Sequence, residues 1–181
     1  MGITAIEKEI EQYILSNLKE RFNLPAEKIS ISETHPLNFP ADARIFRAEK
    51  RGSYGNIYYN YILVNGKFYC SIDENNFSQL LATEKFTSRP RWNPHQFATL
   101  FLHLVVRELR LVESPSDISK SSDEAFNSRI AKITAPSLEI VDNAIEAHFW
   151  SYQARYKRLD YWQIHIDSDY QMTYERLPEP K

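Results

Sequence analysis

The dipeptide Asn65-Gly66 constrains this chain more than any other feature, because it joins two runs of residues whose pattern predicts β-strands. A type I′ turn needs positive φ at both central positions, which Asn and Gly adopt at the least steric cost. Such a turn fixes the register of a hairpin over residues 57–72 and places Tyr61 opposite Cys70. Antiparallel pairing is therefore the first structural expectation.

That register divides the hairpin into two faces of different character. The face expected to lie on the core carries Ile57, Tyr59, Tyr61, Leu63, Phe68, Cys70 and Ile72. The face expected to be amphipathic and open to a partner carries Tyr58, Asn60, Ile62, Val64, Lys67, Tyr69 and Ser71. Cys70 is the only cysteine, so neither an internal disulfide nor a thiolate-based zinc site can form.

The segments before the hairpin complete an N-terminal meander over residues 44–72. A helix is predicted over residues 4–22 with Thr4 as its N-cap, because apolar residues recur there at helical spacing. A short alternating run at residues 29–31 predicts an edge strand, and residues 44–49 predict the strand that precedes the hairpin.

The middle of the chain predicts helices. A short helix is expected over residues 77–86, and a longer one over residues 94–112, with Asn93 as cap and Pro94 in the first turn. The longer helix is apolar round more than half of its circumference, so we expect it to be buried on two sides or packed against a second subunit. Residues 113–122 are polar and predict a flexible loop.

A second meander is predicted over residues 138–177, after a short helix at residues 123–133. A three-residue loop at 167–169 pairs Ile166 with Tyr170 and keeps the large apolar side chains on one face. Strands and helices do not alternate regularly along the chain. We therefore expect a single α+β domain over residues 1–181, an antiparallel sheet built from two meanders with helices packed on one face.

Composition excludes several classes of function. The chain is 43% hydrophobic and 25% charged, and its net charge of -2 gives no general attraction to nucleic acid or to an anionic membrane. It has no signal-peptide pattern and no membrane-spanning apolar run, so we expect a cytoplasmic protein. No phosphate-binding glycine loop, dinucleotide fingerprint or nucleophile elbow is present, and no cofactor is predicted.

The polar face of the second meander is one candidate for acid–base chemistry. The catalytic candidates there are His165, Glu175 and Tyr161, with Trp162, Gln163 and Gln171 as candidate ligand-binding residues. If helices cover this face, a pocket results, and if it faces water, these are ordinary strand residues. His148 could approach His165 from the neighbouring strand, but metal-binding spacing is absent and no metal site is predicted.

Basic and aromatic residues suggest a second alternative, binding of single-stranded nucleic acid. The candidate contacts are Arg47, Lys50, Arg51, Tyr54, Arg155 and Arg158. Aromatic rings beside cations suit unpaired bases and phosphates. Lysine and arginine at sheet edges also discourage aggregation, and the whole chain is slightly acidic, so this alternative is not favoured.

The leading interpretation follows from an apparent excess of apolar surface. The helix at residues 94–112, both faces of the hairpin, and Phe149, Trp150 and Tyr152 together carry more apolar area than one sheet face can cover. Such an excess usually ends at an interface. We therefore expect a small binding or regulatory module that acts through a protein partner or through self-association. The alternative is a monomer in which helices cover both sheet faces.

Overall fold

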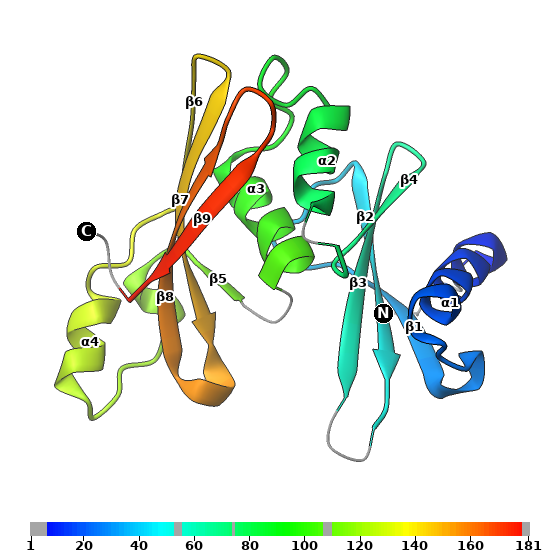
Figure 1. The fold of residues 1–181 in the computed structure, drawn as a ribbon. Helices are drawn as coiled ribbons and strands as arrows, with labels where there is room; N and C mark the ends of the chain where they lie inside the picture. The colour runs from blue at the N-terminus through cyan, green and yellow to red at the C-terminus, as the bar shows by residue number, and fades with distance from the viewer. Residues whose placement is uncertain (1–6, 53–55, 74, 107–109, 179–181) are drawn as a thin grey trace.

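The computed structural model describes residues 7–52, 56–73, 75–106 and 110–178. The helices are α1 (Lys8–Phe22), α2 (Asn76–Thr83), α3 (Pro94–Phe101) and α4 (Glu124–Ile130). The N-terminal sheet contains β1 (Ile29–Thr34), β2 (Ala43–Lys50), β3 (Ile57–Val64) and β4 (Lys67–Cys70). The C-terminal sheet contains β5 (Arg110–Val112), β6 (Ser137–Val141), β7 (Ala144–Gln153), β8 (Arg158–Ile166) and β9 (Met172–Leu177). The layers follow the order α1, N-terminal sheet, α2 with α3, C-terminal sheet and α4 (Figure 1).

The hairpin around Asn65-Gly66 is confirmed. Asn65 has φ of 48° and Gly66 has φ of 75°, as a type I′ turn requires, and Tyr61 lies opposite Cys70. The N-terminal sheet has the simple order β1-β2-β3-β4, with every neighbouring pair antiparallel. The strand predicted at residues 29–31 is part of β1, at the edge of this sheet.

Both faces of the hairpin are buried, which contradicts the prediction of one face open to a partner. On one face, Ile10, Ile14 and Leu18 of α1 form a cluster with core residues of β2 and β3. On the other face, Ile62, Val64 and Tyr69 belong to the main core of the molecule. The predicted cap Thr4 lies outside the described residues.

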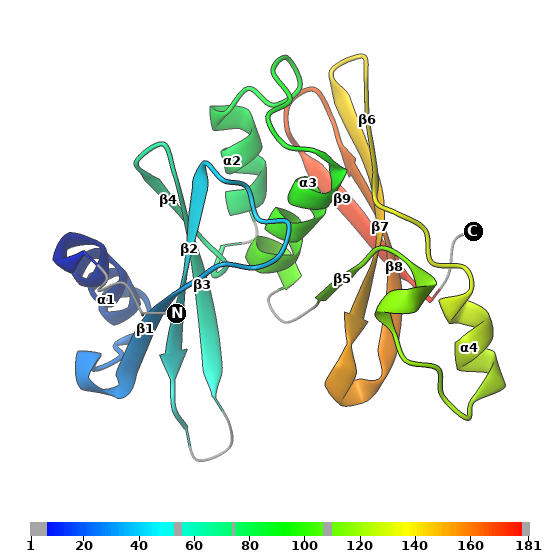
Figure 2. The ribbon, with the colours of Figure 1, turned by 180° about the vertical axis from the view of Figure 1, so that it is seen from behind.

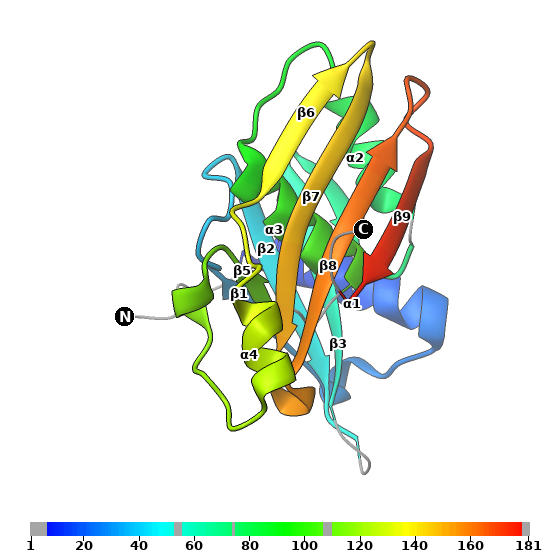
Figure 3. The ribbon, with the colours of Figure 1, turned by 90° about the vertical axis from the view of Figure 1, so that its left-hand side faces the viewer.

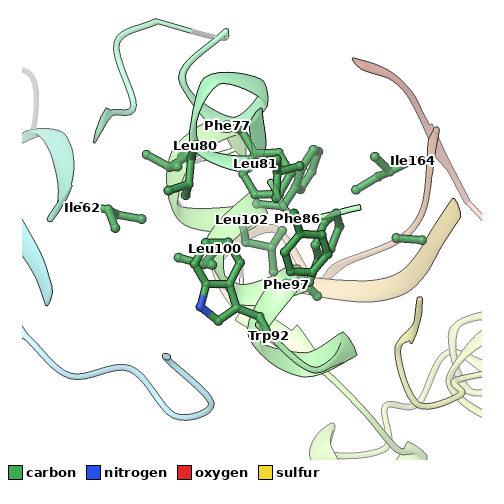
Figure 4. Packing of buried hydrophobic residues seen from close by; sticks show 14 of the residues in the cluster. Ile62, Phe77, Leu80, Leu81, Phe86, Trp92, Phe97, Leu100, Leu102 and Ile164 are labelled. Carbon is green, nitrogen blue, oxygen red and sulfur yellow. The ribbon is translucent and has the colours of Figure 1, made fainter. Parts of the chain in front are cut away.

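The main core lies between the two sheets and is built around α2 and α3. Figure 4 shows their side chains between Ile62 of β3 and Ile164 of β8. Phe101 is the central ring. It meets four other rings edge-on, and the distances between centroids are 5.4 Å to Phe77, 5.7 Å to Phe149, 5.7 Å to Trp162 and 5.5 Å to Tyr174.

The helix predicted over residues 94–112 is shorter in the structure. α3 ends at Phe101, a π-helix follows over Leu102–Val106, and residues 110–112 form β5, which pairs with β7. The predicted cap is confirmed, because the Gln96 backbone N–H donates to Asn93 Oδ1 at 2.9 Å. Apolar periodicity alone does not separate a buried helix from a short buried strand, which explains the error in length.

The connection between β8 and β9 spans residues 167–171 rather than the predicted three residues. Ile166 pairs with Met172 and not with Tyr170. The Asp167 carboxylate organises the longer loop by accepting backbone N–H groups from Asp169 (2.9 Å) and Gln171 (2.8 Å). The shift is by two residues, so the faces of β9 are those predicted.

The α+β class and the antiparallel strands are confirmed, and the arrangement of the layers is more elaborate than predicted. The two meanders form separate sheets, and helices lie on both faces of each sheet, since α4 covers the outer face of β7 and β8 through Ile130, Trp150 and Leu159. Within the predicted flexible loop, Pro115–Asp117 form a 3-10 turn. No helix of the described residues has the length and apolar character needed to cross a membrane.

Candidate functional site

A pocket of about 390 Å³ lies where three segments of the chain meet. These are the connection between β1 and β2, the junction of α3 with the π-helix, and the segment from β5 to the 3-10 turn; Figure 2 shows the first of them reaching α3. The lining residues are Pro36, Leu37, Asn38, Thr99, Leu102, His103, Arg110, Leu111, Glu113 and Asp117. The volume falls within the range of about 300–1,000 Å³ that is typical of small-molecule sites.

The π-helix positions His103 in the wall of this pocket. Single π-helical turns are rare and occur frequently at functional sites, because the wider turn displaces a side chain from its regular helical position. The buried Asn60 of β3 donates from its side-chain amide to the His103 backbone carbonyl at 3.0 Å. The N-terminal sheet therefore fixes the turn that carries the imidazole.

The His103 imidazole is neutral at physiological pH. Burial, reinforced by the nearby positive charge of Arg47, lowers the pKa of His103 to about 4. The Phe39 ring meets the imidazole edge-on, with 5.9 Å between centroids. A neutral imidazole donates from one ring nitrogen and accepts at the other, so it can serve either kind of polar group on a ligand.

Two polar atoms of the pocket wall are buried without a hydrogen-bond partner among the described residues. They are Nδ1 of His103 and Oγ1 of Thr99. A buried polar group without a partner costs about 1–3 kcal/mol of stability, and native proteins contain few of them. Both atoms are themselves buried, so a ligand in the pocket would reach them only if the wall adjusted.

The acidic side of the pocket is organised by Asp117. Its Oδ2 accepts the backbone N–H of Glu113 at 2.7 Å and that of Ser114 at 3.0 Å. These hydrogen bonds, the one from Glu113 first, lower the pKa of Asp117 below its ordinary value. Arg110 donates to the Asp117 backbone carbonyl at 3.1 Å, so a guanidinium and a carboxylate share this side.

Glu113 supplies the second carboxylate. Its Oε1 accepts a short hydrogen bond from the Asn38 side-chain amide, and its Oε2 lies 3.5 Å from His95 Nε2. The Glu113 side chain is about one-third exposed, which leaves it in reach of a ligand in the pocket. The contact with Asn38 also ties the β1–β2 connection to the segment after β5.

The acid–base candidates of the sequence lie elsewhere, on the outer face of the C-terminal sheet. His165 and Glu175 are both exposed there, and the His165 ring contacts Glu146 of the neighbouring strand. Tyr161 shares this face, whereas Trp162 is buried on the opposite face. The candidate ligand-binding residues Gln163 and Gln171 are half-buried and exposed, respectively.

The two histidines considered for a metal are not directly opposite each other in the sheet. His148 lies opposite Gln163 and has Nδ1 3.4 Å from Ser137 Oγ, while His165 lies opposite Glu146. Across the described parts of the chain, no group of three metal-binding side chains is present.

The basic candidates for nucleic-acid contact are divided between loops and the interior. Arg47 lies over the Tyr58 ring at 5.3 Å, and Arg158 forms an ion pair with Asp160 at 2.8 Å. Arg155 lies over the ring of its neighbour Tyr156. Lys50 and Arg51 lie at the end of β2, which Figure 3 places at the same end of the molecule as the β7–β8 connection. Tyr54 lies outside the described residues.

No protein-family model, curated protein or solved structure matches this chain. Sequence reasoning missed the pocket because its residues come from three distant segments. One indication was present. His103 is the one ionisable side chain in the apolar run at residues 97–106, a position where such a side chain has no obvious structural use.

Proposed function

We propose that the protein is a binding module for a small organic molecule that occupies the pocket beside His103. The observation that carries the proposal is a pocket of ligand size whose wall combines a buried, neutral imidazole, that of His103, with a partly exposed carboxylate, that of Glu113. A largely apolar pocket with a few convergent polar groups and a strongly perturbed titratable residue is the usual form of a binding site.

The lining residues favour binding over catalysis. The one hydroxyl among them, Oγ1 of Thr99, has no hydrogen-bond partner among the described residues, so no base is placed to activate it as a nucleophile. The Asp117 carboxylate is engaged with backbone N–H groups, which is a structural use.

The experiment is a thermal-shift screen of a fragment library against three versions of the full chain. The Leu111→Trp variant fills the pocket, and Val141→Trp adds the same indole at an exposed position on β6 as a matched control. A ligand at 100 times its Kd stabilises by about 2.7 kcal/mol, which is about 5 °C or more for a chain of this size. We expect hits that stabilise the wild type and Val141→Trp and do not stabilise Leu111→Trp. The proposal fails if no fragment binds, or if the hits stabilise all three proteins equally.

A protein partner stays a second candidate, supported now by a different observation. The apolar surfaces that first suggested a partner are taken up by the three core clusters of the molecule. However, β9 is the last strand of its sheet, and four of its six residues are exposed. Figure 3 shows β9 at the edge opposite β6. A free strand edge pairs readily with an extended segment. Size-exclusion chromatography with light scattering tests self-association, and a dimer that Tyr174→Lys leaves intact would exclude β9 as its interface.

A further inference from the structure

We infer that the molecule bound beside His103 is a small organic cation, a protonated amine with an apolar body. This inference rests on the function proposed above and narrows it to one class of ligand.

The charges that line the pocket favour a cation. The charged residues that line the pocket are two carboxylates, Glu113 and Asp117, and one guanidinium, Arg110; a second guanidinium, that of Arg47, lies near His103 but is not among the lining residues. The imidazole of His103 contributes no positive charge at neutral pH, because its pKa is lowered to about 4. Arg110 is exposed and already donates to a backbone carbonyl of the same segment. On the side of the pocket formed by Glu113 and Asp117 an ammonium group would be attracted, whereas an anion would be repelled.

The hydrogen-bonding capacity of the wall points in the same direction. A carboxylate has about four acceptor positions, and the contacts with Asn38 and His95 use two of those on Glu113. The Asn38 amide donates one of its two N–H groups to Glu113. The unused acceptor positions of the partly exposed Glu113 carboxylate are complementary to the N–H donors of an amine.

The remaining lining residues suit an apolar body. Leu102 is buried, Leu111 is half-buried, and Leu37 is one of the most exposed large apolar residues of the described chain. Leu37 lies in the β1–β2 connection, and its apolar surface is available to a ligand at that side of the pocket. One ring joined to a short aminoalkyl chain places an ammonium near Glu113 and the ring against these leucines.

The test compares three compounds of matched shape: 2-phenylethylamine, 2-phenylethanol and phenylacetate. Each is titrated into the isotope-labelled full chain at pH 7, and Kd is taken from backbone amide shifts at pocket residues. We expect the amine to bind at least about tenfold more tightly than the other two, since a charge-assisted hydrogen bond is worth that factor or more. We also expect its affinity to fall as salt is added.

Variants with opposite expected signs separate electrostatics from structural damage. Glu113→Gln should weaken amine binding about tenfold, and Arg110→Gln should strengthen it several-fold, because each removes one charge from the wall. Glu139→Gln, at an exposed position on β6, should leave Kd unchanged. A substitution that merely disturbs the fold would weaken amine binding at either position. An increase in the amine affinity of Arg110→Gln is therefore the result that separates electrostatics from structural damage.

The two proposals fail in different ways. If the alcohol or the carboxylate binds the pocket as tightly as the amine, or if Glu113→Gln leaves amine affinity unchanged, the inference of a cation is overturned while the pocket remains a binding site. If none of the three compounds shifts the backbone amides of the pocket and the fragment screen gives no hit, both the proposed binding function and the inference of a cation are wrong.

Discussion

Thr99→Val should make the protein more stable, which is unusual for the removal of a polar group from a core. Oγ1 of Thr99 is buried and has no hydrogen-bond partner among the described residues. A helical threonine normally donates to the carbonyl four residues earlier, and that bond is not formed here. Valine has nearly the same shape and a similar helix propensity, so the substitution replaces an unpaired hydroxyl with a methyl group.

The magnitude follows from the cost of a buried polar group without a partner, about 1–3 kcal/mol. We expect a gain of about 1–2 kcal/mol in the free energy of unfolding, and a rise in Tm of about 2–6 °C for a chain of this length. The assay is urea unfolding followed by tryptophan fluorescence, with a thermal melt as a second readout.

Thr87→Val is the matched control, because the Thr87 hydroxyl lies 3.0 Å from Tyr170 Oη and has a partner to lose. We expect this variant to be less stable by about 1 kcal/mol. If Thr99→Val is destabilised to the same extent as Thr87→Val, then the Thr99 hydroxyl has a partner in solution, and the argument from unpaired pocket groups is wrong.

Three further outcomes follow from the core and the turn. In the unfolded chain His103 regains its ordinary pKa of about 6.5, whereas the folded value is about 4, so the unfolded state binds the extra proton between these pH values. The free energy of unfolding should therefore decrease as pH falls from 6.5 to 4, by up to about 3 kcal/mol from this residue. In urea unfolding at a series of pH values, His103→Asn should lack this contribution to the pH dependence. Phe101→Ala removes the ring that joins α2 to the C-terminal sheet and should cost about 3–5 kcal/mol in the same assay. A cost below about 1 kcal/mol would mean that the packing of α2 on this sheet does not depend on the ring. Gly66→Ala should cost about 1 kcal/mol, from the positive φ alone, because no atom lies within 4 Å of the added Cβ; an unchanged stability would mean that the turn relaxes.

Local sequence signals predicted the elements well where the chemistry of a turn or cap decides them. Asn65-Gly66 set the hairpin register, and Asn93 with Pro94 set the start of α3. These motifs act through neighbouring backbone groups, so no knowledge of distant residues is needed.

Features that depend on tertiary packing could not be predicted in the same way. The face of the hairpin with Ile62 and Val64 resembles a surface for a partner, and only the placement of α2 and α3 between the sheets shows that it is core. The end of α3 and the start of β5 were merged because both are apolar, and strand pairing with β7 decides between them. The apparent excess of apolar surface is likewise absorbed inside one chain.

The pocket beside His103 was out of reach of sequence reasoning for the same reason. Its wall joins residues near positions 37, 103 and 113, and no local pattern connects them. The candidates at His165 and Glu175 were chosen because polar side chains alternate along those strands, a pattern that also describes a sheet face exposed to water.

The most direct test of the central claim is a long-range ¹H–¹⁵N spectrum of the His103 imidazole, recorded at pH 5.5 with and without 2-phenylethylamine. The account predicts the signature of a neutral ring at this pH and a change in the ring nitrogen shifts as the amine is added. A protonated imidazole at pH 5.5, or ring nitrogens that do not respond when the amine saturates the protein, would contradict it.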